Sequence, residues 1–450
     1  MTDNRKQKLI ELGVETLADA LIELSGLSNT ANDKIERMIS TPADNVNRFK
    51  KKLTSLKRSK RFIGWRESHA FEQELELLLE DLKSGVTEPL LGLELVAKFY
   101  EADESIFERC DDSDGIIGDI FRITAKELFE EYATRCDDKE KVADIIIKLC
   151  SNDGYGVRDA LLETTAKCLP KDTIRSMIAK FQKKAEEETQ EYTKSHYLLL
   201  VKLLAKQIKD AGLFQKTYIE SYGKLTPAGI IDIARIQLEN GDIEKAHSLL
   251  KKITDTNSYF TDEKDELLKE IYRKNGDTAK LTELLFKKLR EDHCRETLDE
   301  YLKVIGNDKR EQVITDEVEV IMNDPTLNYA DAEFLMETGK IDEAEGYILK
   351  RADQLNGKFY DALLSIVKLM ESESRDLATS MIYRSLLTSI LERAYNKAYT
   401  YGVRYLRKLD KLADNITDWK GFINQEEFKD QLMQTHGRKQ SFWSKYSNQK

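Results

Sequence analysis

Three aspartates within four residues make the segment 107–121, FERCDDSDGIIGDIF, the clearest candidate for a binding site in the sequence. Carboxylate oxygens are the ligands that Mg²⁺ and other hard cations prefer. Asp111, Asp112 and Asp114 could therefore form an acidic pocket for Mg²⁺ or a cationic group, with Arg109 nearby to orient the ligand. One helix cap does not require three aspartates, and this excess of acid keeps a ligand pocket open as an alternative to a helix start.

The same segment also fits a purely structural role. Asp114 or Ser113 could cap the helix that follows, because side-chain oxygens accept the free N–H groups of a first turn and acids complement the positive end of the helix dipole. An EF-hand is excluded. With Gly115 at loop position 6, Cys110 and Phe121 occupy positions 1 and 12, where calcium requires oxygen ligands. The sequence favours the helix start, and the ligand pocket stays open as the alternative.

A second candidate lies in residues 150–162, CSNDGYGVRDALL. Asn152, Asp153 and Gly154 are typical turn residues, so the simpler interpretation is a loop between two helices with Tyr155 packed beside it. Alternate loops of a helix-pair array lie on the same edge. Asp153 and Tyr155 could therefore lie beside the acidic segment and complete one pocket with it.

A basic segment covers residues 47–66, NRFKKKLTSLKRSKRFIGWR, with nine Lys or Arg and no acid. Basic residues interleaved with aromatic ones, here Phe49, Phe62 and Trp65, are typical of surfaces that bind nucleic-acid phosphates and bases. A solvated helix face, or a surface for an acidic protein, also explains the pattern in a chain with 34% charged residues. The residues expected to contact an anion or nucleic acid here are Lys50, Lys51, Lys52, Lys57 and Arg58.

The tail, residues 436–450 with the sequence HGRKQSFWSKYSNQK, is also basic and aromatic. Arg438 and Lys439 could bind an anion. Phe442 and Trp443 are expected to dock on the last helices, because the end of a helical-repeat stack needs a covering face.

Signatures of catalysis are missing from the sequence. It contains no P-loop, no GxSxG or HExxH motif and no dinucleotide-binding glycine pattern. Five histidines and five cysteines are scattered without metal-ligand spacing, so no metal site, disulfide framework or cofactor is predicted. The cysteines are expected to be reduced thiols.

Helices must position these segments. Only 5 of 450 residues are proline, which breaks helix interiors, and 40% hydrophobic residues suffice for a core. No convincing series of alternating strands is present, whereas apolar residues recur at helical spacing. In residues 118–136 the shared apolar face consists of Ile120, Phe121, Leu128, Phe129 and Tyr132. The sequence therefore predicts an all-α protein.

Glycines that can end helices recur at a nearly fixed period. Gly241, Gly276, Gly306 and Gly339 are separated by 35, 30 and 33 residues, close to the period of tetratricopeptide repeats, about 34 residues. Two units also have an alanine seven residues before and five residues after the glycine, namely Ala234 and Ala246, and Ala332 and Ala344. The pattern predicts a tetratricopeptide-like array of helix pairs that winds into a right-handed superhelix.

We expect an irregular helical region over residues 1–140, and the repeat array with its capping tail over residues 141–450. The first residues, MTDNRKQKLIELGVETL, lack the apolar run of a signal peptide, and no stretch approaches the roughly 18 apolar residues of a membrane span. A soluble cytoplasmic protein without membrane association is expected. The net charge of −11 argues against nucleic acid as the partner of the chain as a whole.

Four segments together resemble a bacterial family of large helical proteins of unknown function: RSKRFIGWRE at 58–67, FERCDDSDGIIGDIF at 107–121, NDGYGVRD at 152–159 and HGRKQSFW at 436–443. The resemblance covers nearly the whole chain. It implies a bacterial helical-repeat fold and supplies no reaction. Within these segments it makes six positions worth testing: Arg109, Asp111, Asp112, Tyr155, Arg438 and Trp443.

Helix-pair arrays form grooves that bind peptides, helices or partner domains. The sequence therefore favours a non-enzymatic scaffold that binds a protein partner in such a groove. Two alternatives stay open. One is nucleic-acid binding through residues 47–66, and the other is a ligand sensor or enzyme built on residues 107–121. The oligomeric state is also left open.

Overall fold

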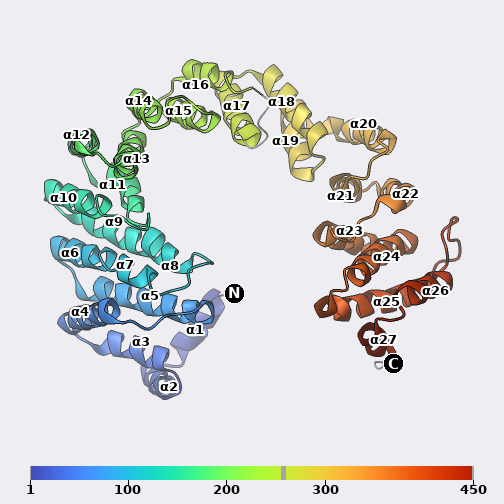
Figure 1. Ribbon diagram of the computed structural model, residues 1–450, viewed down its shortest axis with the longest axis horizontal. Helices are drawn as coiled ribbons and strands as arrows, with labels where there is room; N and C mark the ends of the chain where they lie inside the picture. The colour runs from blue at the N-terminus through green and yellow to red at the C-terminus, as the bar shows by residue number, and fades with distance from the viewer. Residues whose placement is uncertain (1, 255–259, 448–450) are drawn as a thin grey trace. The chain divides into compact units, whose positions relative to one another are not determined.

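A computed structural model describes residues 2–254 and 260–447. Their secondary structure is helical, without strands in these ranges, and an isolated β-bridge joins Ile63 to Cys110 (Figure 1). The all-α helix-pair fold expected from the sequence is confirmed. Every helix in these two ranges is either too short or too polar to cross a lipid bilayer.

The chain packs as two compact units, Met1–Lys264 (unit 1) and Asp265–Lys450 (unit 2). The division falls inside the region that the sequence assigned to the repeat array. Residue 140 lies within unit 1, in the first turn of a helix. The boundary expected near residue 140 rested on a change in the regularity of helix spacing, and it stays a prediction about repeat type.

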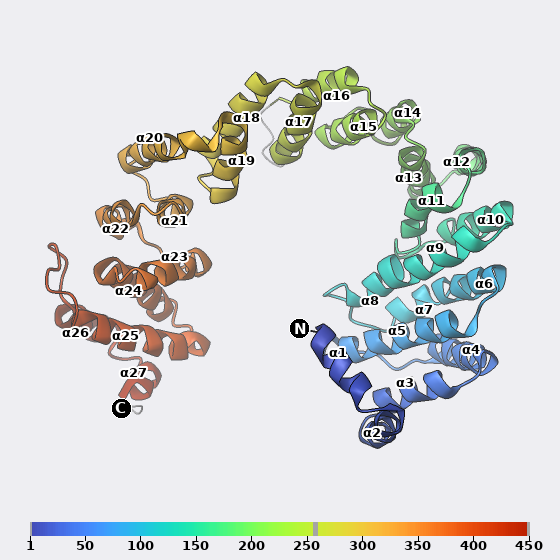
Figure 2. The same ribbon diagram turned by 180° about the vertical axis from the view of Figure 1, so that it is seen from behind.

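Unit 1 consists of consecutive helices that pack on their neighbours in sequence, such as α4 on α5 and α12 on α13 (Figures 1 and 2). Its helices are α1 (Thr2–Glu11), α2 (Val14–Leu27), α3 (Asn29–Ile39), α4 (Pro42–Arg58), η1 (Trp65–Glu67), α5 (Ser68–Gly85), α6 (Pro89–Tyr100), α7 (Asp103–Phe107), α8 (Ile116–Asp119), η2 (Ile120–Ala125), α9 (Lys126–Arg135), α10 (Lys139–Cys150), η3 (Asp159–Thr164), α11 (Thr165–Cys168), α12 (Lys171–Glu187), α13 (Glu191–Gln207), α14 (Ala211–Tyr222), α15 (Pro227–Glu239) and α16 (Ile243–Leu250).

Close packing in unit 1 is clearest where α6 meets α9. The Tyr132 ring lies so near Gly92 that a Cβ atom at Gly92 would come within 2.5 Å of it. The buried Tyr132 hydroxyl donates to the carbonyls of Leu82 and Val86, at 3.1 and 3.2 Å, so its polar end is satisfied. Glycine at position 92 therefore permits a large aromatic side chain to tie α9 to the end of α5.

Unit 2 continues the pattern of neighbouring helices, such as α18 with α19 and α24 with α25. Its helices are α17 (Thr261–Asn275), which crosses the boundary, α18 (Thr278–Glu291), α19 (Arg295–Ile305), η5 (Asn307–Lys309), α20 (Arg310–Asn323), α21 (Tyr329–Glu337), α22 (Ile341–Lys350), η6 (Ala352–Gln354), α23 (Tyr360–Ser372), α24 (Asp376–Glu392), η7 (Asn396–Ala398), α25 (Tyr399–Ala413), α26 (Gln425–His436) and α27 (Gln440–Ser447).

The periodic glycines and alanines have the roles that their spacing predicts. Each of the four glycines follows a helix with a positive φ, a conformation that glycine adopts at little cost. Their φ angles are 82° at Gly241, 67° at Gly276, 105° at Gly306 and 79° at Gly339. The paired alanines are all fully buried at helix contacts, namely Ala234, Ala246, Ala332 and Ala344.

Candidate functional site

The acidic segment starts a helix, and Asp112 is the residue that caps it. Its Oδ1 accepts from the backbone N–H of Ile117 at 2.8 Å, and its Oδ2 accepts from that of Gly118 at 3.0 Å. Asp114 is exposed, and Asp111 accepts from the backbone N–H and the hydroxyl of Ser113. The cap expected at Asp114 or Ser113 therefore lies at Asp112, since Gly115, with φ of 78°, turns the chain back over it.

Arg109 does not point at the three aspartates as an orienting group. Its guanidinium lies 5.1 Å from the centre of the Phe71 ring and donates to the Arg61 carbonyl at 3.5 Å. Burial lowers the pKa of Arg109. The backbone on either side of Cys110 pairs with Ile63, with N–H···O distances of 2.8 and 2.9 Å. Arg109 thus helps to fasten the 59–64 loop to this segment.

Asp153 organises the second predicted loop. Its two carboxylate oxygens accept from five consecutive backbone N–H groups, those of residues 155–159, at 2.7 to 3.3 Å. A carboxylate with so many donors is held in place by the loop and holds the loop in turn. The structural interpretation of this turn is therefore well supported by its geometry.

The two predicted segments do meet, through residues outside the acidic cluster. The rings of Phe107 and Tyr155 stack at 4.9 Å between centroids. Buried Asp103 receives two hydrogen bonds from the Arg158 guanidinium, at 2.6 and 2.8 Å. Partial desolvation and the nearby carboxylates of Glu108 and Glu104 raise the pKa of the Tyr155 hydroxyl, although its ring is 42% exposed. One aromatic stack and one buried ion pair thus join α7, which leads into the acidic segment, to the second loop.

A polar pocket of about 310 Å³ lies beside this junction, and Asp153 lines it together with Glu104, Tyr192 and His196. None of the residues 109–114 lines it. The structure therefore places Asp153 in this pocket and leaves Tyr155, like Asp111, Asp112 and Asp114, outside it. His196 and Tyr192 are pocket residues that the sequence analysis did not find, because no spacing links them to the loop.

Asp159 lies next to the pocket residue His196 and has an altered pKa. Burial raises the pKa of Asp159 to about 6, with His196 opposing the shift and Asp153 adding to it. His196 Nδ1 lies 3.9 Å from Asp159 Oδ2, while His196 Nε2 donates to the Cys150 carbonyl at 2.8 Å. Asp159 is not among the residues that line the pocket. It is therefore an interior group of the loop rather than a carboxyl offered to a ligand.

The basic segment presents only part of its charge to solvent. Lys50, Lys51, Lys57 and Arg58 are exposed, whereas Lys52 pairs with Asp33 at 3.1 Å. Phe49 is fully buried in the core, and Phe62 and Trp65 are exposed. A shallow hollow of about 470 Å³ on α4 is lined by Lys51, Thr54, Ser55, Arg58 and Ser59.

The tail packs on unit 2 through its aromatic residues. Phe442 is fully buried with its ring centroid 5.7 Å from that of Tyr399, and Trp443 Nε1 donates to the His436 carbonyl at 3.0 Å. Arg438 is exposed and Lys439 is half-buried. Neither lines the pockets described in this section.

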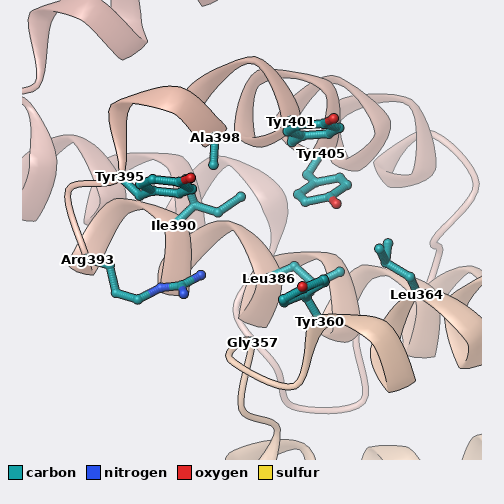
Figure 3. A pocket seen from close by; sticks show the side chains of 10 residues that line it. All are labelled: Gly357, Tyr360, Leu364, Leu386, Ile390, Arg393, Tyr395, Ala398, Tyr401 and Tyr405. Atoms are coloured by element: carbon teal, nitrogen blue, oxygen red, sulfur yellow. The ribbon is translucent and has the colours of Figure 1, made fainter. Parts of the chain in front are cut away.

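A tyrosine-rich pocket in unit 2 is the most apolar hollow of those described here, with a volume of about 400 Å³ (Figure 3). Figure 3 shows that its walls come from the loop before α23, from α23 and α24, from the connection between α24 and α25, and from α25. We call it the tyrosine pocket. It is lined by Gly357, Tyr360, Leu364, Leu386, Ile390, Arg393, Tyr395, Ala398, Tyr401 and Tyr405.

Local sequence explains how the tyrosine pocket forms. A Cβ atom at Gly357 would lie 2.3 Å from the Ser385 carbonyl oxygen, so only glycine lets this loop approach α24. Tyr401 and Tyr405 are four residues apart and share one face of α25, while Tyr399 points into the core. The spacing of these tyrosines was the available signal for the pocket, but it does not reveal which face is covered.

No cluster of metal-ligand side chains is present in the part of the chain that the structure describes. Across residues 2–254 and 260–447, His, Cys, Asp and Glu side chains nowhere gather in threes or more with a geometry that could hold an ion.

Comparisons with known proteins give a family and no activity. A family model described as a family of unknown function (DUF6880) matches residues 2–445. A search of curated proteins finds no match to the chain.

Proposed function

The chain belongs to a family of unknown function (DUF6880), and from its own surface we propose that it is a non-enzymatic protein-interaction scaffold. In this proposal the tyrosine pocket receives an anchor side chain from a peptide segment of a partner protein. The tyrosine pocket is the single observation that carries the proposal.

The chemistry of the tyrosine pocket suits such an anchor. Its walls combine aliphatic side chains, such as Leu386 and Ile390, with tyrosine rings that stay about half exposed at Tyr360, Tyr395 and Tyr401. Tyrosine supplies a large apolar surface at low entropic cost and is enriched at the energetic centres of interfaces. We therefore expect an aliphatic or aromatic anchor side chain.

Charge around the tyrosine pocket favours an acidic residue next to the anchor. Arg393 lines the pocket, and the Arg404 guanidinium lies 5.5 Å from the centre of the Tyr401 ring. Arginine pairs with carboxylates through two parallel hydrogen bonds, which adds direction to the contact. The preferred segment would therefore carry Asp or Glu beside an apolar residue.

Selection from a library of displayed random linear peptides, with the full chain as bait, tests the proposal. The expected result is a consensus with an apolar anchor and a neighbouring acid. A synthetic consensus peptide should bind the wild type at least about tenfold more tightly than Tyr401→Ala or Leu386→Arg, which corresponds to about 1.4 kcal/mol.

Tyr192→Ala is the matched control, because Tyr192 is an exposed tyrosine of unit 1, outside the tyrosine pocket. It should leave the affinity unchanged. No enriched consensus, or a peptide that binds Tyr401→Ala as tightly as the wild type, would overturn the proposal.

A second candidate function, nucleic-acid binding, is favoured by the hollow on α4. It combines Lys51 and Arg58 with three hydroxyl side chains, a combination that suits a phosphate group. Single-stranded oligonucleotides should then bind at low salt, and Lys51→Glu/Arg58→Glu should abolish that binding. The control Lys171→Glu/Arg175→Glu changes two exposed basic residues of α12 and should have little effect. No binding by the wild type at low salt would exclude this function.

A further inference from the structure

The first helices of unit 1 expose an unusual amount of apolar surface. Ten large apolar side chains between residues 9 and 39 are exposed, from 37% at Leu21 to 85% at Val14. They are Leu9, Ile10, Leu12, Val14, Leu21, Ile22, Leu24, Leu27, Met38 and Ile39. An accumulation of exposed large apolar side chains in one region of a folded protein indicates an interaction site. We call residues 5–39 the N-terminal surface.

Helix α2 is not integrated into the core of unit 1. It contains no buried residue, although it packs along α3. The main core of unit 1 begins with Phe49 on α4. Figures 1 and 2 draw α2 beyond α3, at the outer end of the unit. An outermost helix of a repeat stack needs a polar outer face, and α2 instead leaves apolar side chains uncovered.

The charges of the N-terminal surface are segregated by helix. Residues 5–11 of helix α1 carry Arg5, Lys6 and Lys8 and one acid, Glu11, while the first turn of α1 also contains Asp3. Helix α2 carries Glu15, Asp19 and Glu23 at intervals of four residues and no basic residue. Residues four apart share one face of a helix, so these acids form a single stripe. Six of these charged side chains are exposed, namely Arg5, Lys6, Lys8, Glu15, Asp19 and Glu23.

We propose that the N-terminal surface pairs with the same surface of a second copy of this chain, forming a two-fold symmetric dimer. In such a contact every pair of residues that meet across the interface occurs twice, once in each direction. Antiparallel apposition places the basic residues 5–8 of α1 of one copy along acidic α2 of the other. The exposed leucines and isoleucines of both copies then cover each other.

Size and charge both suit a second copy. A standard interface uses about 20 to 30 residues from each partner, and residues 5–39 are numerous enough to supply them. Acid and base in similar number on one surface avoid the repulsion that a uniformly charged patch would have against its own copy. Because the surface carries both the basic and the acidic residues of each ion pair, a second copy of the chain supplies every charge partner that it needs.

Sedimentation or light scattering of the full chain across a concentration series tests the dimer. The wild type is expected to sediment as a dimer at micromolar concentration. Two charge-reversal variants isolate the contact: Arg5→Glu/Lys6→Glu/Lys8→Glu on α1, and Glu15→Lys/Asp19→Lys/Glu23→Lys on α2. Each alone places like charges opposite each other twice and should be monomeric.

An equimolar mixture of the two variants is the decisive sample. Reversed α1 of one variant then faces reversed α2 of the other, and unchanged α2 faces unchanged α1. The mixture should therefore form a heterodimer although neither variant self-associates. Restored pairing also shows that both variants are folded, so loss of the homodimer cannot come from unfolding.

Apolar contact is tested with Ile22→Asp/Leu27→Asp, which should be monomeric at concentrations where the wild type is dimeric. The control Ile123→Asp changes an apolar residue that is 51% exposed and lies outside the N-terminal surface, and it should stay dimeric. A wild type that is monomeric throughout, a dimer that survives both Asp substitutions, or a mixture that stays monomeric would each overturn the proposal.

Discussion

Nδ1 of His293 lies 2.7 Å from Oδ1 of Asp331 in the buried interior of unit 2. On its other side, His293 Nε2 lies 3.2 Å from Oε2 of Glu317, which also accepts from Arg290. Tyr347 donates its hydroxyl to the second oxygen of Asp331 at 3.2 Å. Burial alone would lower the pKa of His293, but the two carboxylates raise it to about 9. The imidazole is therefore charged in the folded protein at neutral pH.

The stability of unit 2 should depend on pH through His293. Its pKa is about 9 when folded and about 6.5 when unfolded, so the folded state binds the proton more tightly. This stabilisation, on the order of 3 kcal/mol, is complete below pH 6.5 and is lost as pH rises through about 9. In urea unfolding, the difference between wild type and His293→Gln should shrink between pH 6.5 and 9.5. Parallel curves across that range would contradict the prediction.

Asp159 should act in the opposite direction. Its pKa of about 6 is raised above the unfolded value, so the folded state holds the proton longer and loses stability as pH rises from about 4 through 6. Asp159→Asn removes this cost, and should raise the free energy of unfolding by about 1–3 kcal/mol at pH 8 and by less at pH 4.5. Asp172→Asn, at a site with a 93% exposed side chain, serves as control. An equal effect at both pH values would rule out the assigned cause.

The aspartates of the two loops should differ sharply in their structural importance. Asp153→Ala removes the acceptor of five backbone N–H groups and should destabilise unit 1 by about 2–4 kcal/mol. Asp112→Ala removes a helix cap and should cost about 1–2 kcal/mol. Exposed Asp114→Ala should stay within about 0.5 kcal/mol of the wild type. Equal costs at Asp112 and Asp114, measured by chemical denaturation, would contradict the capping role.

Gly357 and Gly346 form a matched pair for the walls of the tyrosine pocket. Gly357→Ala forces its loop away from α24, because the new methyl group would overlap the Ser385 carbonyl, and should cost about 1–3 kcal/mol. Gly346 lies inside α22 with open space around it, so Gly346→Ala should instead stabilise unit 2 by about 0.5–1 kcal/mol. Thermal unfolding distinguishes the two signs. Stabilisation by Gly357→Ala would show that the loop yields without strain.

The regular part of the fold could be predicted from the sequence because its determinants are local. Gly241 and Gly339 end helices with positive φ, and Ala246 and Ala344 are fully buried, as their spacing indicated. These roles depend on neighbours a few residues away, and a periodic pattern reports them directly. The helix cap of the acidic segment was predicted at Asp114 or Ser113, which was wrong. The turn at Gly115 brings the carboxylate of Asp112 to the first N–H groups of the helix instead.

The candidate sites were harder to predict because they depend on which side chains meet across helices. Asp153 was identified, but its pocket partner His196 comes from α13, which no motif connects to the loop. In the tyrosine pocket, Tyr360 and Tyr401 belong to different helices, and only the narrow approach at Gly357 brings their elements together. Sequence spacing gives the face of one helix and does not give what that face meets.

The packing of each helix on its sequence neighbours has a consequence for how the chain is made. Unit 1 has core clusters of its own, from Phe49 to Ile208 and from Ala205 to Ile236. Contacts between near neighbours close quickly, and domains of this kind fold as the ribosome releases them. Unit 1 should therefore complete its core while residues after 265 are still being added. Synthesis would then deliver a folded first half before the tyrosine pocket of the second half exists.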